Sequence, residues 1–183
     1  MALGIKGLFL SSITFMKHLF VLLFFLPALA FAQDCNVKKL KDKFSQEPIY
    51  SSGFMHFTSL KGEKVSLSIE ADSKEIRLLY SIRDNCFNDQ STVVFSFDGS
   101  KSKSNMKAGN AMNCDGIFTV VFRNTNSTSF ALNKIATQKT TGMTFIGSNN
   151  QKIEVVLTEE EKQNLQFKAD CLVKEAKNLI KAQ

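Results

Sequence analysis

Short stretches in which apolar and polar residues alternate dominate the middle of the chain. From Val65 to Ile69 every second residue is apolar, and the same alternation resumes from Ile76 to Ile82 after a polar turn. Because successive side chains of a strand point to opposite faces, such alternation is typical of strands with one face in a core. The pattern predicts a β-hairpin over residues 65–82.

Further stretches of the same kind follow along the chain. They predict additional strands near residues 54–57, 93–97, 118–122, 143–145 and 153–157. Residues 100–113 have little apolar content, which fits either an exposed edge strand or a mobile loop. Leu132 and Ile135 have the spacing of one or two helical turns. Most of the domain is therefore expected to be antiparallel sheet.

The spacing of apolar residues becomes helical near both ends of the chain. Asp34 can cap a short helix from Cys35 to Phe44, and Thr158 with Glu161 fits a capping box before an apolar stripe that runs to Leu179. We therefore predict an α+β fold. In this fold an antiparallel β-sheet or two-sheet sandwich carries a short N-terminal helix and a long C-terminal helix packed on it.

The N-terminus has the three parts of a secretory signal peptide. Met16-Lys17-His18 precedes an apolar run that begins at Leu19, and the small residues of Ala30-Phe31-Ala32 form a cleavage pattern. The apolar run is shorter than the ~20 residues that cross a bilayer. We predict a signal peptide over residues 1–32, with Met16 as an alternative start. Residues 33–183 would then form a single disulfide-stabilised β-rich domain without a transmembrane segment, exported to the periplasm, the cell surface or the medium.

All four cysteines, Cys35, Cys86, Cys114 and Cys171, lie in the predicted mature domain. An even number in an oxidising compartment predicts two disulfides. The absence of a Cys-x-x-Cys motif argues against a zinc knuckle and a thioredoxin-type redox pair. Of the three pairings, we favour Cys86 with Cys114, which would join the ends of neighbouring strands. Cys35 with Cys171 would then join the first helix to the last.

Residues suited to catalysis are few. His56 is the only histidine beyond the predicted signal peptide, so a Ser-His-acid mechanism would depend on it, but its place on an alternating strand favours a packed or edge role. Asp84 and Asp89 flank Cys86 and could form a carboxylate pair, yet acids of this kind are typical of turns. The sequence has no phosphate-binding glycine loop, calcium loop or dinucleotide motif. We predict no catalytic, metal-binding or cofactor-binding residue and favour a non-enzyme.

Charge gives a weak indication of a partner. The chain has a net charge of +6 at pH 7, and removal of the signal peptide leaves a mildly basic domain, which is not a nucleic-acid signature. Lysines cluster over residues 38–43 and again over 168–181. These clusters are either the solvated faces of helices or sites of attraction for anionic surface polymers or lipid headgroups.

Several features together resemble uncharacterised exported proteins of Bacteroidota bacteria. They are a signal ending in Ala-Phe-Ala-Gln, a Phe97-Asp98-Gly99 turn, Asn113-Cys114-Asp115-Gly116 before an aromatic strand, and a final helix containing Cys171-Leu172. The resemblance implies export from a bacterial cell. It implies no activity and no catalytic residue.

The sequence predicts a non-catalytic exported domain that binds a protein or a cell-envelope component. Its phenylalanines are expected to form the core, because the chain has 17 Phe and no Trp. Apolar residues on the second phase of the alternation, Met55, Phe57, Leu79 and Val94, indicate that part of the sheet is apolar on both faces. An alternative function follows from this excess, carriage of a hydrophobic ligand in a cavity between the sheet and the C-terminal helix. A small hydrolase is the least favoured alternative, and the sequence says nothing of the oligomeric state.

Overall fold

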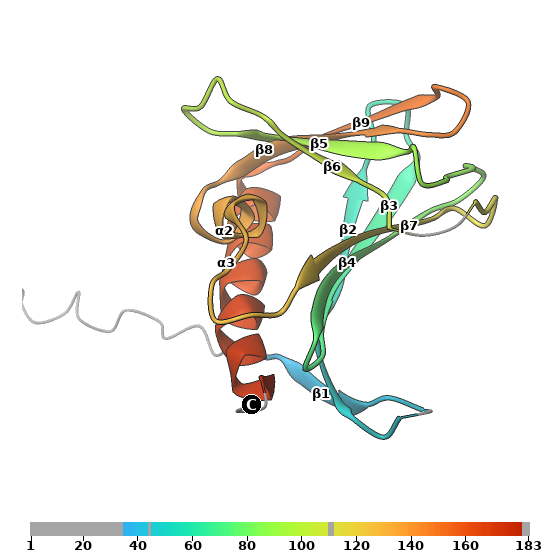
Figure 1. The fold of residues 1–183 in the computed structure, drawn as a ribbon. Coiled ribbons are helices and arrows are strands. Elements are labelled where there is room, and N and C mark those ends of the chain that lie inside the picture. The colour runs from blue at the N-terminus through green and yellow to red at the C-terminus, as the bar shows by residue number, and fades with distance from the viewer. Residues whose placement is uncertain (1–34, 44, 110–111, 181–183) are drawn as a thin grey trace, which may run out of the picture. The chain divides into compact units, whose positions relative to one another are not determined.

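The alternating stretches form two antiparallel sheets in the computed structural model (Figure 1). The structure describes residues 35–43, 45–109 and 112–180, so the predicted signal peptide lies outside the described residues. The elements are β1 (Lys38–Lys41), β2 (Pro48–Thr58), β3 (Lys64–Ala71), β4 (Glu75–Ile82), β5 (Thr92–Phe97), β6 (Ser104–Lys107), β7 (Ile117–Arg123), α2 (Phe130–Thr137), β8 (Thr140–Ile146), β9 (Lys152–Val156), α3 (Glu159–Ala176) and the 3-10 helix η2 (Lys177–Leu179).

One sheet has five strands in the order β1-β2-β3-β4-β7, and the other has four in the order β6-β5-β8-β9. Every neighbouring pair of strands is antiparallel. The four-stranded sheet lies across one end of the five-stranded sheet, and α3 stands opposite the five-stranded sheet (Figure 1). The predicted α+β fold is confirmed in its two-sheet form, with the long C-terminal helix packed on β2, β3 and β8.

The two sheets are joined along both margins. At one margin Ser59, just after β2, forms an antiparallel bridge with Val155 of β9. At the other margin the backbone N–H of Gly109, just after β6, donates to the carbonyl of Thr119 in β7 at 2.7 Å. These contacts give backbone partners to strands that would otherwise be open edges. The joined sheets hold their inner faces around one core.

That core contains a cluster of aromatic rings. Tyr80 packs edge-to-face against Phe118 and Phe145, and Phe118 does the same against Phe87. All four side chains are fully buried. Edge-to-face pairs add about 0.5–1.5 kcal/mol each beyond burial of their area. The prediction that the phenylalanines form the core is confirmed at these positions.

The long helix begins where the sequence indicates. Thr158 accepts from the backbone N–H of Glu161, and the carboxylate of Glu161 accepts from the backbone N–H of Thr158, which completes a capping box. Its apolar stripe is buried against the sheets, at Leu165, Ala169 and Leu172. The helix ends at Ala176 and tightens into η2, so the predicted helical stretch is divided into two pieces.

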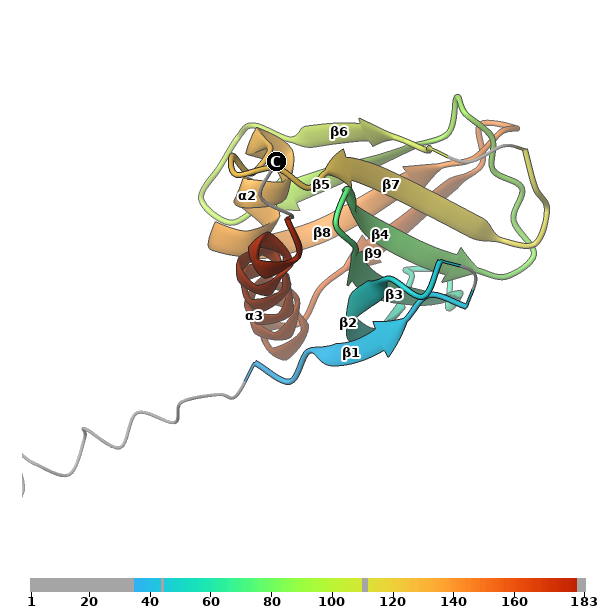
Figure 2. The same ribbon diagram turned by 60° about the horizontal axis from the view of Figure 1, so that its bottom comes forward.

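The predicted helix over Cys35 to Phe44 is wrong, because this segment contains strand β1. Its residues pair with Pro48–Ser51 of β2, and β1 forms the edge of the five-stranded sheet (Figure 2). A turn closes the hairpin, with the backbone N–H of Asp42 donating to the carbonyl of Glu47. A helix this short is marginal by itself, and pairing with β2 supplies the backbone hydrogen bonds instead. The short helix of the domain is α2, where Leu132 and Ile135 indicated helical turns.

Two features left open by the sequence are settled. Residues 104–107 form β6, the edge strand of the four-stranded sheet, rather than a mobile loop. The disulfides join Cys35 to Cys171 and Cys86 to Cys114, which are the pairs favoured from the sequence. Cys86 and Cys114 flank the paired strands β4 and β7, whereas Cys35 ties the segment before β1 to α3. Within the described ranges, no helix has the length and apolar character needed to cross a membrane.

Candidate functional site

The five-stranded sheet turns one face toward the core and the other toward solvent. We call the second the outer face. The register places its side chains in rows across the strands, such as Phe54 beside Ser68 and Leu79, and His56 beside Ser66 and Ser81. The inner positions between them, including Met55 and Phe57, belong to the core. The helix α3 stands on the inner side of this sheet, so it leaves the outer face uncovered (Figure 1).

Exposed apolar side chains lie on the outer face. Phe54 is 62% exposed, Val121 is 39% exposed and Ile117 is 37% exposed. The ring of Phe54 lies parallel to that of His56, with centroids 6.4 Å apart. Contiguous exposed apolar side chains mark interaction surfaces. Phe54 on β2 is separated from Ile117 and Val121 on β7 by two strands, and Leu79 of β4 lies between them.

Of the residues expected on an apolar second face, Leu79 does lie on it and is half-buried. The assignment of Met55 and Phe57 to that face is wrong, because they pair with Leu67 and Val65 and belong to the core.

Charges on the outer face are separated along the strands. Lys64 and Arg83 lie at the end that contains His56, whereas Glu70 and Glu75 lie toward the other end, in the rows of Arg77 and Arg123. Arg77 is neutralised by an ion pair with Asp72. The His56 end is therefore basic, and the opposite end is of mixed charge.

A groove of about 560 Å³ opens at the basic end of the outer face. It is formed by the last residues of β2, the first of β3 and the last of β4. Its lining is His56, Phe57, Thr58, Lys64, Ser66, Ser81 and Arg83. The lining contains three nitrogen-bearing side chains and three hydroxyls, and it contains no carboxylate. These side chains can all donate hydrogen bonds, and none of them carries a negative charge that would repel an anion.

One hydrogen bond within the groove fixes the histidine. Nδ1 of His56 lies 2.9 Å from Oγ of Ser66 on the neighbouring strand. The other ring nitrogen, Nε2, has no hydrogen-bond partner among the residues that the structure describes. The cross-strand contact therefore holds the ring in place while Nε2 stays available to a ligand.

The two groove cations lack protein partners. Neither Lys64 nor Arg83 forms a side-chain hydrogen bond or an ion pair within the described part of the chain. Other basic residues do, as in the pairs of Arg77 with Asp72, Lys152 with Glu154, and Lys174 with Asp170. A cation without a protein counter-ion keeps its full charge for an incoming anion.

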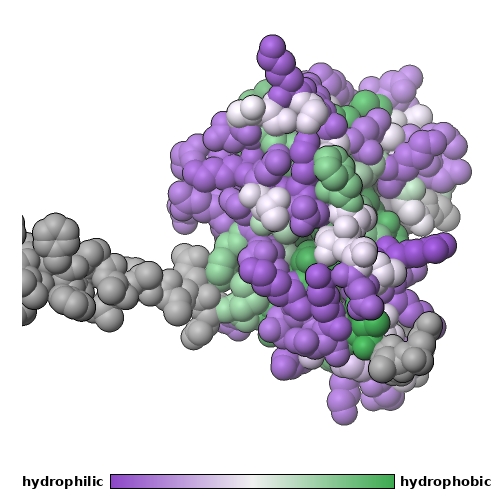
Figure 3. Space-filling view, turned by 60° about the vertical axis from the view of Figure 1, so that its left-hand side comes forward, coloured by the Kyte–Doolittle hydropathy of each residue, from purple (hydrophilic) through white to green (hydrophobic). Residues whose placement is uncertain are grey.

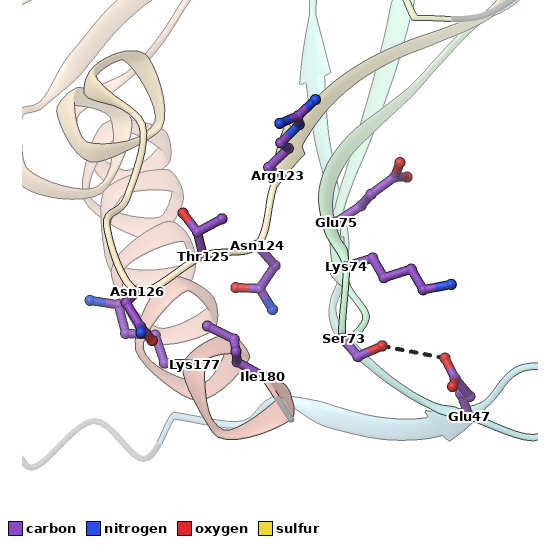
Figure 4. Close-up of a pocket in the computed structure, with 10 residues that line it drawn as sticks. All are labelled: Glu47, Ser73, Lys74, Glu75, Arg123, Asn124, Thr125, Asn126, Lys177 and Ile180. Atoms are coloured by element: carbon purple, nitrogen blue, oxygen red, sulfur yellow. Dashed lines mark hydrogen bonds between the residues drawn. The ribbon is translucent and has the colours of Figure 1, made fainter. Parts of the chain in front are cut away.

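A second cavity, which we call the cleft, lies between η2 and the turn from β3 to β4 and has a volume of about 1000 Å³ (Figure 4). Its lining mixes acids and bases, with Glu47 and Glu75 beside Lys74, Arg123 and Lys177. Acidic and basic groups thus both reach this cavity, and neither sign of charge dominates it. Lys74 extends away from the helix (Figure 4), and Ser73 donates from Oγ to the Glu47 carboxylate at 3.4 Å.

The side chain in the middle of the cleft has a structural role. Nδ2 of Asn124 donates to the carbonyls of Asp72 and Ala176, each at 2.8 Å, and its backbone N–H donates to the carbonyl of Lys74. Asn124 is buried and connects the β3–β4 turn to the end of α3. Hydrogen bonds of Asn124 in the cleft therefore link the end of α3 to the five-stranded sheet.

The two lysine clusters noted in the sequence meet in the fold. The Cys35–Cys171 disulfide brings the segment before β1 to α3. Burial lowers the pKa of Lys168, and the nearby charge of Lys38 lowers it further. The helical side of the molecule is mainly hydrophilic, with small hydrophobic areas between the polar ones (Figure 3). Lys38 comes from a strand, so the prediction that this cluster lies on a helix is wrong.

The acids considered for catalysis do not form a site with His56. Asp84 and Asp89 are exposed and lie in the segment between β4 and β5, and neither lines the groove or the cleft. Within the described residues, no group of three His, Cys, Asp or Glu side chains is placed to hold a metal ion. The sequence predicts that His56 lies on a strand but does not indicate that Ser66 and Ser81 lie beside it. The polar phase of the hairpin, which contains Lys64, Ser66 and Ser81, is the pattern that could have indicated a polar site there.

Buried apolar side chains line the interior next to α3. Leu165, Ala169 and Leu172 of the helix are fully buried, as are Leu67 and Ile69 of β3, against which the helix packs. The groove and the cleft, by contrast, are lined mainly by polar residues and lie at the surface. Carriage of a hydrophobic ligand stays a prediction that neither cavity supports.

No protein-family model, curated protein or solved structure matches this chain.

Proposed function

We propose that this protein is an exported, non-catalytic binding domain that attaches to an acidic polymer of the bacterial cell envelope through its outer face. The single observation that carries the proposal is the composition of that face. It combines exposed apolar side chains with cations that have no counter-ion in the described part of the chain. Apolar contact supplies affinity, and the cations select a negatively charged partner.

Export is part of the proposal. Two disulfides support it, because disulfides persist in oxidising compartments outside the cytosol. The signal-peptide pattern of residues 1–32 and the resemblance to exported proteins of Bacteroidota point the same way. The periplasm, the cell surface and the medium all fit a domain braced in this manner.

The proposal is tested by paired substitutions on the two sides of the molecule. The variant Phe54→Ala with Val121→Ala removes apolar side chains from the outer face. The matched control, Phe130→Ala with Val156→Ala, removes the same two residue types at more exposed positions, on α2 and β9. Each purified domain is sedimented with washed, protease-treated envelopes of a Bacteroidota bacterium, and circular dichroism verifies that both variants are folded.

The outer-face variant is expected to lose at least about tenfold in affinity, since truncation of a buried interface anchor commonly costs more than 1.4 kcal/mol. The control is expected to bind like the wild type. Binding should also weaken as salt is raised, because the partner is acidic. Equal binding by both variants, or binding that is insensitive to salt, would contradict the proposal.

A further inference from the structure

The groove at the basic end of the outer face has the character of an anion site. Lys64 and Arg83 bring two cationic groups to it from adjacent parts of the hairpin, and His56 brings Nε2 from β2. None of these groups is satisfied within the described residues, and Thr58 and Ser81 add hydroxyls that also have no partner there. Unused donors gathered in one hollow indicate a ligand rich in acceptor atoms.

The groove has no acidic side chain in its lining. The cleft near η2, by contrast, has two acids among its lining residues. The nearest acids of the outer face in register, such as Glu70, lie farther along the strands, in the row of Ser51 and Arg77. An anion in the groove therefore meets no acidic lining residue, although Glu63, which accepts from Ser59, precedes Lys64 and Asp84 follows Arg83 in the chain.

The combination of donors favours a phosphate group. Arg presents a planar fork that binds oxyanions through two parallel hydrogen bonds, and Lys acts as a compact point charge. A phosphate ester offers several acceptor oxygens, so it can engage both cations and a neighbouring hydroxyl together. The volume of about 560 Å³ is that of a pocket for a small molecule, which leaves room for the group that carries the phosphate.

We infer that this groove binds a phosphate ester, with Lys64 and Arg83 neutralising its charge and His56 Nε2 and Ser81 donating to its oxygens, while Ser66 donates to Nδ1 of His56. The inference rests on the proposed function and names the chemical group of the polymer that the outer face recognises. Two sources carry this chemistry, a phosphorylated saccharide and a phospholipid headgroup. The experiment separates them by using one probe of each kind.

The test follows the amide and side-chain NMR signals of His56, Ser66 and Ser81 in the mature domain with its disulfides intact. The probes are glucose 6-phosphate, glucose as its uncharged counterpart, polyglutamate as an anion without phosphate, and vesicles of phosphatidylglycerol compared with phosphatidylcholine. The groove variant is Lys64→Glu with Arg83→Glu. The control, Lys101→Glu with Lys107→Glu, reverses the same number of charges at exposed positions before β6 and at its last residue. The four substituted residues are exposed, so both variants are expected to fold.

Glucose 6-phosphate is expected to shift the three signals saturably, while glucose leaves them unchanged. The groove variant should bind at least about tenfold more weakly, because a charge-assisted hydrogen bond contributes more than a tenfold change in affinity. The control variant should bind like the wild type. If the vesicles of phosphatidylglycerol bind with the same dependence on Lys64 and Arg83 and the sugar phosphate does not, the phosphate assignment is supported with the lipid headgroup as its source, and the polymer named in the proposed function is wrong.

Three results would overturn the inference. They are the absence of a saturable shift with both phosphate probes, equal binding by the groove variant and the wild type, and binding of polyglutamate without binding of either phosphate probe. Failure here is distinguishable from failure of the proposed function. Envelope binding that still depends on Phe54 and Val121 would retain the outer face as the binding surface and remove only the phosphate assignment.

Discussion

The phenol hydroxyl of Tyr80 lies 3.8 Å from the sulfur of Met143, so a weak hydrogen bond links β4 of one sheet to β8 of the other. Tyr80 is fully buried. Burial raises the pKa of its phenol above the ordinary value near 10. The centre of the core thus contains an ionisable group that the folded protein keeps neutral.

Replacing Tyr80 with Phe is expected to change the free energy of unfolding at pH 7 by less than about 1 kcal/mol, because a thioether is a weak acceptor. The effect should appear at alkaline pH. In the unfolded wild type the phenol ionises above pH of about 10, whereas in the folded state it stays neutral, so stability is intact below that pH and declines above it.

Urea denaturation between pH 9 and 11.5 tests this expectation. The Phe variant should lose less stability over this range than the wild type. Phe145→Leu serves as a control for sensitivity, because loss of a ring from the aromatic cluster should destabilise the domain by about 1 kcal/mol or more at every pH. Identical alkaline profiles for the wild type and Y80F would show that Tyr80 is not held neutral by the core.

Asn124→Ala is expected to lower the free energy of unfolding by about 2–3 kcal/mol. The substitution leaves the carbonyls of Asp72 and Ala176 without their shared donor at a buried position. Asn126→Ala is the matched control, because Asn126 lines the same cleft but is exposed, and should change stability by less than about 0.5 kcal/mol. Equal effects in urea denaturation would contradict the fastening role of Asn124.

The two disulfides are expected to contribute unequally. Cys86 and Cys114 are 28 residues apart and Cys35 and Cys171 are 136 residues apart. The chain-entropy relation gives about 3.6 kcal/mol for the shorter loop and about 5 kcal/mol for the longer one. Double Cys→Ala variants, unfolded in urea without reductant, should follow that order. A larger loss on removing Cys86 and Cys114 would contradict it.

Gly116→Ala is expected to destabilise the domain more than Gly62→Ala. Both glycines have a positive φ, +74° and +87°, which costs an alanine about 1–2 kcal/mol. A Cβ at Gly116 would also collide with the backbone carbonyl of Ile82, whereas a Cβ at Gly62 would meet open space. The collision should add about 1–3 kcal/mol in thermal or urea denaturation. Equal losses would show that the β4–β7 junction relaxes around the added methyl.

Local patterns predicted those elements whose own residues contain the complete signal. The β3–β4 hairpin follows from alternation and a polar turn, and α3 follows from Thr158 and Glu161 together with its apolar stripe. The helical spacing of Val37 and Leu40 predicts a helix over the segment from Cys35 to Phe44. Its structure depends on pairing with β2, which spacing within the segment does not reveal.

The candidate site was only partly predictable for a related reason. Alternation placed His56 on a strand, but the register of three strands decides that Ser66 and Ser81 lie in its row. The lysine clusters were visible, yet the groove cations are Lys64 and Arg83, which are isolated in the sequence. An interaction surface formed across strands has no contiguous motif.

Hydroxyl-radical footprinting of the domain in the presence of washed bacterial envelopes tests the proposed binding surface most directly. Phe54 on the outer face is 62% exposed and Phe130 at the start of α2 is 77% exposed, so both rings oxidise readily in the free protein. Binding through the outer face predicts that envelopes suppress oxidation of Phe54 and leave that of Phe130 unchanged. Protection of Phe130 with continued oxidation of Phe54 would contradict the assignment.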